Sequence, residues 1–255
     1  RRWVNLFVIN LQPSELMKIG IILFLSNYYH KISEGDVNKV QYLLYPVIAI
    51  MAPFILVLSQ PDLGTAILIL LSGIVVTWLA GVKWKIFAYL SIIAIITAPI
   101  AISFLKPYQK SRILTFLNPD SDPLGAGYQI IQSKIAIGSG GLFGKGFLNG
   151  SQAYLNFLPE KHTDFIFTLY SEEHGFLGSV FMVFLYFLIT YRIIRIGNMT
   201  RSIFAKLYCF GFANAFFIYV AVNMSMVLGL LPIVGAPLPI LSYGGSSMLA
   251  IMLGL

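Results

Sequence analysis

The stretch over residues 157–178 concentrates the side chains that could do acid–base chemistry. It reads FLPEKHTDFIFTLYSEEHGFLG and holds four of the ten acidic residues, in a chain where charged residues make up only 11%. Thr163 is a good N-cap, and a helix that begins near it would place Asp164 on one stripe with Thr168 and Ser171. The side chains around this stripe are apolar or aromatic. We therefore expect Asp164 to lie where a wet surface meets an apolar one, which suits a carboxylate base.

The composition predicts a membrane protein made of helices. Hydrophobic residues make up 58% of the 255 residues, against about 45–50% in ordinary globular domains. The apolar runs over residues 62–80 and 86–104 are long enough to cross a hydrocarbon core about 30 Å thick. The net charge of +7 favours anionic lipid or an anionic substrate, whereas nucleic acid would require a basic soluble face. The single cysteine, Cys209, excludes a disulfide within the chain.

Two short motifs open predicted spans, and both carry acidic side chains. In QPSELMK, Pro13 suits the first helical position, and Glu15 and Lys18 fall on one face, where they would neutralise each other. A structural ion pair is the favoured interpretation, and a direct role stays open. In QPDLGT, which starts at Gln60, Asp62 lies in a first helical turn, where the helix dipole favours an anion. A helix cap and a functional carboxylate are both consistent with this position.

The long segment over residues 106–163 is predicted to lie outside the membrane and to be ordered. It contains a short amphipathic helix that ends at Asn118, a second amphipathic stretch over residues 128–137, and a glycine-rich run over residues 138–146. That run follows no strand and lacks the spacing of a nucleotide-binding loop, so its glycines are better suited to tight turns, and binding of a phosphate stays open as the alternative. Loops of this length with internal order are usually functional.

The remaining apolar segments complete a single all-α, polytopic membrane domain over residues 1–255. We expect spans over residues 176–191 and 207–228, and a last one that begins near Met248 and is too short to cross a bilayer. The chain does not open on a Met or a signal peptide. We therefore expect it to be the middle and end of a larger protein.

The basic residues predict which end of the bundle faces the cytoplasm. One set of short loops holds Lys31, Lys39, Lys83, Lys85, Arg192, Arg195, Arg201 and Lys206, whereas the alternate set has neither Lys nor Arg. By the positive-inside rule the first set is cytoplasmic. The long loop has six basic residues of its own, but long loops are weaker evidence. The two QP motifs, Asp164 and the SYGGSS loop around Ser242 then share the extracytoplasmic face, as one common site would require.

The chemistry that these residues permit is transfer from a lipid pyrophosphate to an alcohol. A single carboxylate base would take the hydroxyl proton while cations such as Lys110, Arg112 and Lys134 stabilise the departing diphosphate. Attraction to lipid headgroups, worth about 1 kcal/mol per residue, would also account for the cations. The sequence has no cluster of His, Cys and carboxylate residues at the spacing of metal ligands. It also indicates no Ser–His–Asp triad, because His162 and His174 are equally consistent with interface or packing roles.

Taken together, the motifs resemble the SEDS family (shape, elongation, division and sporulation). The resemblance covers essentially the whole chain and is carried by QPSELMK, QPDLGT, FLNPDSDPLGAGY, PEKHTDFIF with EEHG, and GLLPIVGAPLPILSYGGSS. Within the family, IIQSKIAIGSGGLFGKG is similar to the RodA elongation type.

The resemblance implies a ten-helix peptidoglycan glycosyltransferase of the bacterial inner membrane that polymerises lipid II during cell elongation and maintains rod shape. Its implied partners are a class B penicillin-binding transpeptidase and the elongation machinery. It also implies that Asp164 is the catalytic carboxylate, that Glu15 and Lys18 form a functional core pair, and that the first three helices are missing. Lys110 departs from the family, in which Arg is more frequent at this position.

Several roles stay open on the sequence alone. The candidate substrate-binding residues are Lys110, Arg112, Lys134, Glu160, His162 and Ser242, and Gln60 and Asp62 form a structural or functional motif. No cofactor or metal site is predicted, and assistance by a divalent cation is left open. The rival functions are a lipid II flippase and a scaffold without activity that recruits the transpeptidase. A flippase would need polar residues along a path through the membrane, whereas Glu15, Lys18 and Asp62 gather near one face.

Overall fold

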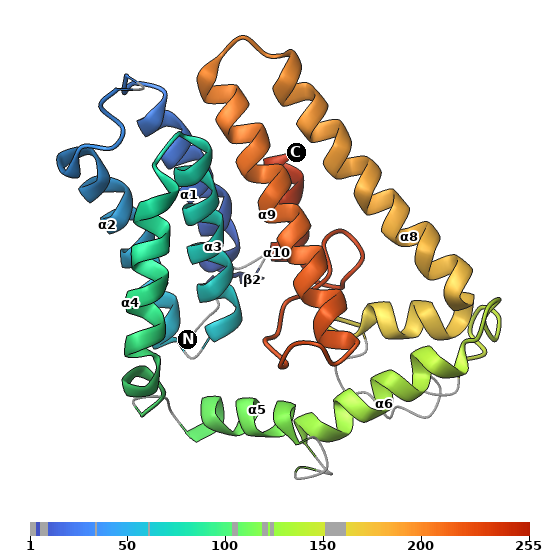
Figure 1. The fold of residues 1–255 in the computed structure, drawn as a ribbon. Helices are drawn as coiled ribbons and strands as arrows, with labels where there is room; N and C mark the ends of the chain where they lie inside the picture. Colours follow the sequence, from blue (N-terminus) through green and yellow to red (C-terminus); the bar gives the residue numbers. More distant parts are fainter. Residues whose placement is uncertain are drawn as a thin grey trace.

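The computed structural model describes residues 4–5, 10–33, 35–60, 62–103, 107–118, 122, 125–150 and 162–255. Helices make up nearly all of the regular structure in this part of the chain (Figure 1). Two short strands, β1 (Val4–Asn5) and β2 (Asn10–Leu11), pair antiparallel ahead of the first helix. The helices are α1 (Pro13–Tyr29), α2 (Val40–Ser59), α3 (Leu63–Leu79), α4 (Trp84–Ser103), α5 (Pro107–Leu117), α6 (Ala126–Ser139), α8 (Ile166–Met199), α9 (Ile203–Val227) and α10 (Gly245–Gly254).

The helices form a membrane bundle, as the composition predicts. Among the described residues, α2, α8 and α9 are long and apolar enough to cross a bilayer, and α3, α10 and much of α4 are shorter apolar helices. In Figure 1, α1 to α4 lie on one side, α8 lies on the other, and α9 and α10 stand between them. α9 joins the two sides because it contacts α1 and α3 as well as α8. α5 and α6 run across one end of the bundle.

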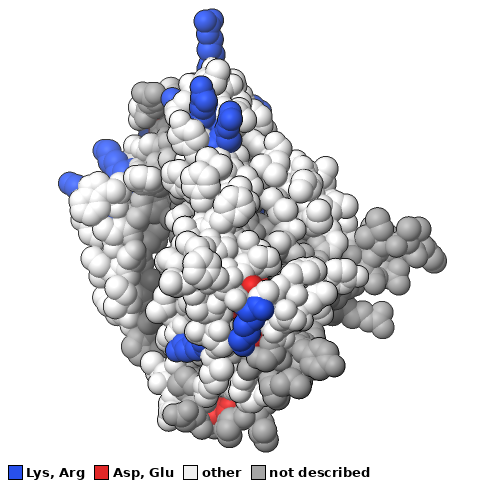
Figure 2. Space-filling view, turned by 90° about the vertical axis from the view of Figure 1, so that its right-hand side faces the viewer, with Lys and Arg blue, Asp and Glu red and all other residues white. Residues whose placement is uncertain are grey.

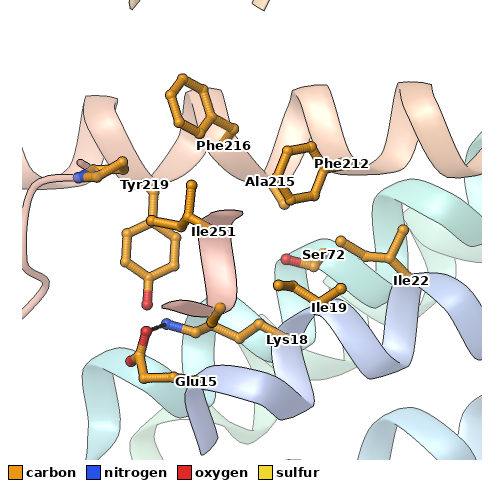
Figure 3. A pocket seen from close by; sticks show the side chains of 12 residues that line it. Glu15, Lys18, Ile19, Ile22, Ser72, Phe212, Ala215, Phe216, Tyr219 and Ile251 are labelled. Carbon is orange, nitrogen blue, oxygen red and sulfur yellow. Dashed lines mark ion pairs between the residues drawn. The ribbon is translucent and has the colours of Figure 1, made fainter. Parts of the chain in front are cut away.

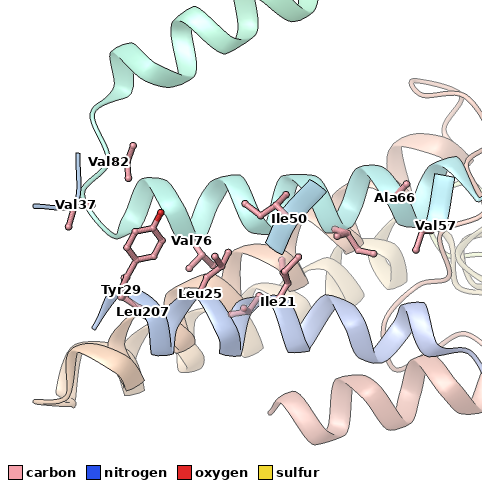
Figure 4. Packing of buried hydrophobic residues seen from close by; sticks show 13 residues of the cluster. Ile21, Leu25, Tyr29, Val37, Ile50, Val57, Ala66, Val76, Val82 and Leu207 are labelled. Carbon is pink, nitrogen blue, oxygen red and sulfur yellow. The ribbon is translucent and has the colours of Figure 1, made fainter. Parts of the chain in front are cut away.

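Close helix packing builds the core between α1, α2 and α3 (Figure 4). Ile21, Leu25 and Ile69 have at most 1% of their surface exposed. A Cβ atom on Gly73 would collide with the side chain of Ile50, so glycine at this position lets α3 approach α2. Small residues at helix contacts matter in membranes because van der Waals packing, rather than the hydrophobic effect, holds helices together there.

α8 differs from the prediction at its beginning. The predicted helix starts near Thr163, whereas the observed one starts at Ile166, and residues 162–165 form a turn. Hydrogen bonds from distant parts of the chain explain the difference, since Ser242 Oγ donates to the carbonyl of Thr163 and Asn223 Nδ2 donates to that of Asp164. Asp164 therefore precedes the helix and does not share a helical stripe with Thr168.

A break at Gly175 divides α8 into a short first segment and a long second one. Gly175 has φ 67° and ψ −162°, a combination that is essentially restricted to glycine. The turn over residues 140–146 packs against this break: Phe176 N donates to the carbonyl of Gly141, and Leu177 N donates to that of Leu142. The glycine-rich run thus forms tight turns, as predicted, and holds the two segments of α8 at an angle (Figure 1).

The connection from α9 to α10 lies at the same end of the bundle as α5 and α6 (Figure 1). The last helix begins at Gly245, three residues before the predicted Met248. On the face that Figure 2 shows, most of the basic side chains lie toward the opposite end of the bundle, and a few lie in its lower half. The predicted asymmetry of charge is therefore a feature of the folded bundle.

Candidate active site

A pocket of about 510 Å³ opens at the end of the bundle where α5 and α6 lie. It joins parts of the chain that are far apart in sequence, and each contributes polar groups. They are the start of α1 with Gln12 and Glu15, the start of α3 with Asp62 and Thr65, Arg112 of α5, Gln129 of α6, the turn with Thr163 and Asp164, and the connection before α10 with Tyr243 and Ser246.

Asp164 is positioned through its backbone. Its carbonyl accepts a hydrogen bond of 2.8 Å from Nδ2 of the buried Asn223, which also donates to the carbonyl of Ala236 at 2.6 Å. One residue earlier, the carbonyl of Thr163 accepts a bond of 2.6 Å from Ser242 Oγ. The turn is therefore fixed to α9 and to the α9–α10 connection. The carboxylate lies beside Gly235, where a Cβ atom would come within 3.6 Å of Asp164 Oδ2.

Asp62 links two of the predicted motifs. Its Oδ1 accepts a bond of 3.2 Å from Thr65 N, which caps α3. Its Oδ2 accepts a bond of 3.3 Å from Gln12 Nε2, and Gln12 N in turn donates to Ser246 Oγ at 3.2 Å. Asp62 is therefore the helix cap that the sequence allows, and it also lines the pocket.

Glu15 and Lys18 form a buried ion pair at the base of the pocket. The distance between Glu15 Oε2 and Lys18 Nζ is 2.7 Å, and both side chains are less than 10% exposed. Lys18 Nζ lies 4.0 Å from the centre of the Tyr219 ring, close enough for a cation–π contact. Figure 3 shows the hydroxyl of Tyr219 pointing toward the pair, next to a cavity of about 40 Å³ with mostly apolar walls. Glu15 lines this cavity and the larger pocket.

The structure brings only some of the predicted substrate-binding residues to the pocket. Arg112 lines it and donates from Nη1 to the carbonyl of Ile233 at 3.0 Å. The other cations, Lys110 and Lys134, are not among its described lining residues, and Lys134 packs across Gly229, where a Cβ atom would collide with it.

Three further predicted positions lie elsewhere, and one cannot be placed. Gln60 is exposed at the end of α2. His162 and Ser242 line a neighbouring hollow. The Ser242 hydroxyl accepts a bond from Leu238 N at 2.7 Å in addition to the bond that it donates to Thr163, so it supports the turn that carries Asp164. Glu160 lies outside the described residues.

Sequence reasoning missed two groups that support the site. Asn223 holds Asp164, and its signal in the sequence is an amide within an apolar helix, where polar residues are expensive; α9 has two of them, Asn214 and Asn223. Glu172 is fully buried and pairs with Lys145 at 2.6 Å. The pair joins the first segment of α8 to the glycine-rich turn, where Lys145 N also donates to the carbonyl of Glu172. A stripe on a single helix could not have indicated this pair.

The described lining of the pocket contains three carboxylates and one guanidinium. The Glu15 carboxylate pairs with Lys18, and the Asp62 carboxylate caps the N-terminus of α3. Asp164 is held through its backbone carbonyl, which accepts a hydrogen bond from Asn223. Over the described ranges, no group of three or more His, Cys, Asp or Glu side chains is close enough to hold a metal ion. The arrangement offers carboxylates for proton transfer and a guanidinium that can bind a phosphate.

Fold and site together define a polytopic helical membrane protein with a polar pocket at one end of the bundle. The family model for FtsW, RodA and SpoVE, described as cell cycle proteins, matches residues 1–255. The chain therefore belongs to this family, as its motifs predict.

Among curated proteins, the chain is 43% identical to the peptidoglycan glycosyltransferase MrdB of Escherichia coli K12, over all of this chain and 68% of that protein. It is 36% identical to the stage V sporulation protein E of Bacillus subtilis, over 97% of this chain and 67% of that protein. A probable peptidoglycan glycosyltransferase FtsW of Buchnera aphidicola is 37% identical, over all of this chain and 67% of that protein.

The chain is also similar in fold to solved structures. One similar chain comes from a structure described as the structural coordination of polymerization and crosslinking by a peptidoglycan synthase complex. Its TM-score is 0.82 and its identity is 33%, over all of this chain and 70% of that one. The rod shape determining protein RodA of Thermus thermophilus is similar with a TM-score of 0.67 and 27% identity, over all of this chain and 66% of that one. The all-helical membrane fold that the sequence predicts is confirmed.

Proposed function

We propose that this chain carries the active site of a peptidoglycan glycosyltransferase that polymerises lipid II on the extracytoplasmic side of the bacterial inner membrane. The names of the curated relatives support this activity. The observation that carries the proposal is the pocket itself, because it gathers Asp164, Asp62, Glu15 and Arg112 from separate parts of the chain. It lies at the end of the bundle away from most of the basic residues that Figure 2 shows, and the positive-inside rule assigns that basic end to the cytoplasm.

In the proposed reaction Asp164 is the general base. It accepts the proton from the 4-hydroxyl of the N-acetylglucosamine of one lipid II molecule. The hydroxyl oxygen then attacks the anomeric carbon of the glycan that bears undecaprenyl diphosphate. The new glycosidic bond forms as the bond to the diphosphate breaks, with inversion at that carbon.

Arg112 is the described cation best placed to stabilise the diphosphate that leaves. A guanidinium has five N–H donors, so one bond to the carbonyl of Ile233 still leaves it able to grip a phosphate. Glu15 and Lys18 have a supporting role in this proposal, because the ion pair shapes the base of the pocket without changing its net charge.

The proposed partner is a class B penicillin-binding transpeptidase, working with the machinery of cell elongation. The similarity to a chain from a peptidoglycan synthase complex supports it. The chain spans about two thirds of the length of its curated relatives, so experiments on activity need the full-length protein.

The test is the substitution Asp164→Asn in the purified full-length protein with its transpeptidase partner. We expect glycan polymerisation to be lost, because an amide cannot accept the hydroxyl proton. A matched control is Asp36→Asn, which removes a carboxylate from an exposed loop outside the pocket and should leave polymerisation unchanged. Retained polymerisation by Asp164→Asn would remove this residue from the mechanism.

The same variant separates the enzyme from its rivals. A flippase would move the lipid II headgroup across reconstituted vesicles whether or not Asp164 is present. A scaffold without activity would leave cell shape normal after Asp164→Asn. Loss of polymerisation together with loss of rod shape would favour the enzyme over both.

A further inference from the structure

The pocket with Asp164 has a neighbour of similar size. A hollow of about 580 Å³ is lined by His162, Ile166, Leu241, Ser242 and Met248 among others, and we name it the outer hollow. Tyr243 and Gly244 line both the outer hollow and the pocket of about 510 Å³. The two spaces therefore meet at one residue pair of the SYGGSS motif.

Tyr243 is fixed to the turn that carries Asp164. Its backbone N donates to the carbonyl of His162 at 2.9 Å, and the preceding Ser242 donates to the carbonyl of Thr163 at 2.6 Å. The turn over residues 162–165 is thus divided between the two spaces, since His162 lines the outer hollow and Asp164 lines the pocket. A ligand that contacts Tyr243 would lie at a fixed place relative to the proposed base.

The ring of Tyr243 is exposed and is not packed against the rest of the protein. Tyr243 is 83% exposed even though hydrogen bonds hold its own backbone and that of its neighbour. A tyrosine has only two side-chain torsions, so ordering its ring against a ligand costs little entropy. Ile240, at the edge of the outer hollow, has φ 69°, which is an outlier for a β-branched residue. Strain of this kind gathers at functional sites.

The outer hollow differs from the pocket in chemistry. Ile166, Leu241 and Met248 give it apolar walls, and the side chains of His162 and Tyr243 contribute polar groups, whereas the Ser242 hydroxyl is already bound to the backbone. A pyranose ring has one face of C–H groups, which packs on an aromatic ring, and an edge of hydroxyl and amide groups, which a histidine can bind. The walls of the outer hollow and the ring of Tyr243 match these two sides.

We propose that the outer hollow is a second saccharide subsite, in which an N-acetylated pyranose stacks on Tyr243. This inference rests on the proposed function, because a polymerase must hold two saccharides at once, one on each side of the bond that it forms. The pocket with Asp164 and Arg112 then holds the reacting end of one saccharide. The outer hollow holds a ring of the other, and Tyr243 separates them.

The test measures binding in the absence of turnover. The full-length protein with its partner, carrying Asp164→Asn, is titrated with the soluble disaccharide of N-acetylglucosamine and N-acetylmuramic acid, and saturation-transfer NMR reports the Kd. Adding Tyr243→Ala should raise the Kd about tenfold, because the stacking surface is removed. Adding Tyr243→Phe should leave it unchanged. Tyr89→Ala, which removes an exposed ring from α4, is the control for the loss of an aromatic residue.

A second variant tests the hollow without removing any contact. Gly245 lines the outer hollow, and a Cβ atom there meets nothing within 4 Å. Gly245→Leu should therefore fold and fill the space, and the same titration should show weaker binding. An unchanged Kd in both Tyr243→Ala and Gly245→Leu would assign Tyr243 to the aromatic belt of the membrane surface and overturn the subsite.

The proposed function and the subsite can fail separately. If Asp164→Asn abolishes polymerisation but Tyr243→Ala and Gly245→Leu leave the Kd unchanged, the proposed function is retained and the subsite is rejected. Retained polymerisation in Asp164→Asn would remove the proposed base, while the two binding experiments would still decide whether the outer hollow takes a saccharide.

Discussion

At the scale of single residues, the proposed base depends on groups that bind the backbone around it. Asn223 and Ser242 bind the backbone carbonyls of Asp164 and Thr163. Because hydrogen bonds to buried backbone groups are costly to break, these two side chains hold the turn in place. The chemistry proposed for Asp164 therefore needs an amide on α9 and a hydroxyl on the connection before α10.

The Glu15–Lys18 pair should be more sensitive to single than to double substitution. Glu15→Gln or Lys18→Met alone leaves one buried charge without its partner, which we expect to cost about 3–5 kcal/mol. The double variant removes both charges and should recover most of that loss. Thermal unfolding of the full-length protein in detergent measures the difference. A double variant as unstable as the two single variants combined would show that the pair is not the source of the stability.

At the scale of elements, the break in α8 lies between the turn that carries Asp164 and the long membrane-spanning segment. The first segment of α8 follows directly from the turn with Asp164, and the second segment is one of the apolar helices long enough to span the membrane. Gly175 lets the chain change direction between them, and the turn over residues 140–146 fills the angle. The Lys145–Glu172 pair, in which only Glu172 is buried, fastens that turn to the first segment.

Gly175→Ala should weaken the fold and the activity together. An alanine must adopt a backbone conformation that is nearly exclusive to glycine, at a cost of about 1–3 kcal/mol, and its Cβ would also collide with the backbone of Leu142 and Gly144. The control is Gly138→Ala on α6, where a Cβ meets nothing within 4 Å. That change should be neutral or stabilising by up to about 1 kcal/mol. Equal melting temperatures for the two variants would contradict the role of the break.

At the scale of the whole molecule, the bundle is polar at its ends and apolar on its outside. Phe184 and Phe187 of α8 and Ile92 and Ile95 of α4 are more than half exposed, as expected for surfaces that face hydrocarbon. On the face that Figure 2 shows, most of the basic side chains lie toward one end of the bundle, and the pocket opens at the other end (Figure 1). By the positive-inside rule, this asymmetry favours the orientation that the proposed function requires.

The orientation predicts which single cysteines react from outside the cell. In the full-length protein with Cys209→Ser, a membrane-impermeant maleimide should label Phe147→Cys in intact spheroplasts, because Phe147 is exposed on the turn beside the pocket end of α8. Lys83→Cys, on the exposed turn between α3 and α4, should react only after the membrane is permeabilised. Labelling of Lys83→Cys in intact spheroplasts would reverse the orientation and place the pocket on the cytoplasmic side.

The sequence by itself determined the family, the helical membrane fold and the motifs from which the pocket is built. Apolar runs predict spanning helices because hydrocarbon offers no hydrogen-bond partners, and a helix satisfies its backbone N–H and C=O groups within its own segment. The QPSE, QPDL and SYGGSS motifs each contribute residues to the pocket. The start of α8 was predicted wrongly, because Thr163 was expected to cap a helix on local grounds alone.

Only the tertiary structure decided where the polar groups of the site lie. The bonds that keep Asp164 out of the helix come from residues 59 and 79 positions away from their acceptors, and no local pattern encodes such partners. Folding likewise placed Arg112 in the pocket and Lys134 outside it, although both were equally basic candidates in the same loop. Helix formation depends on neighbours in sequence, whereas the site depends on neighbours in space.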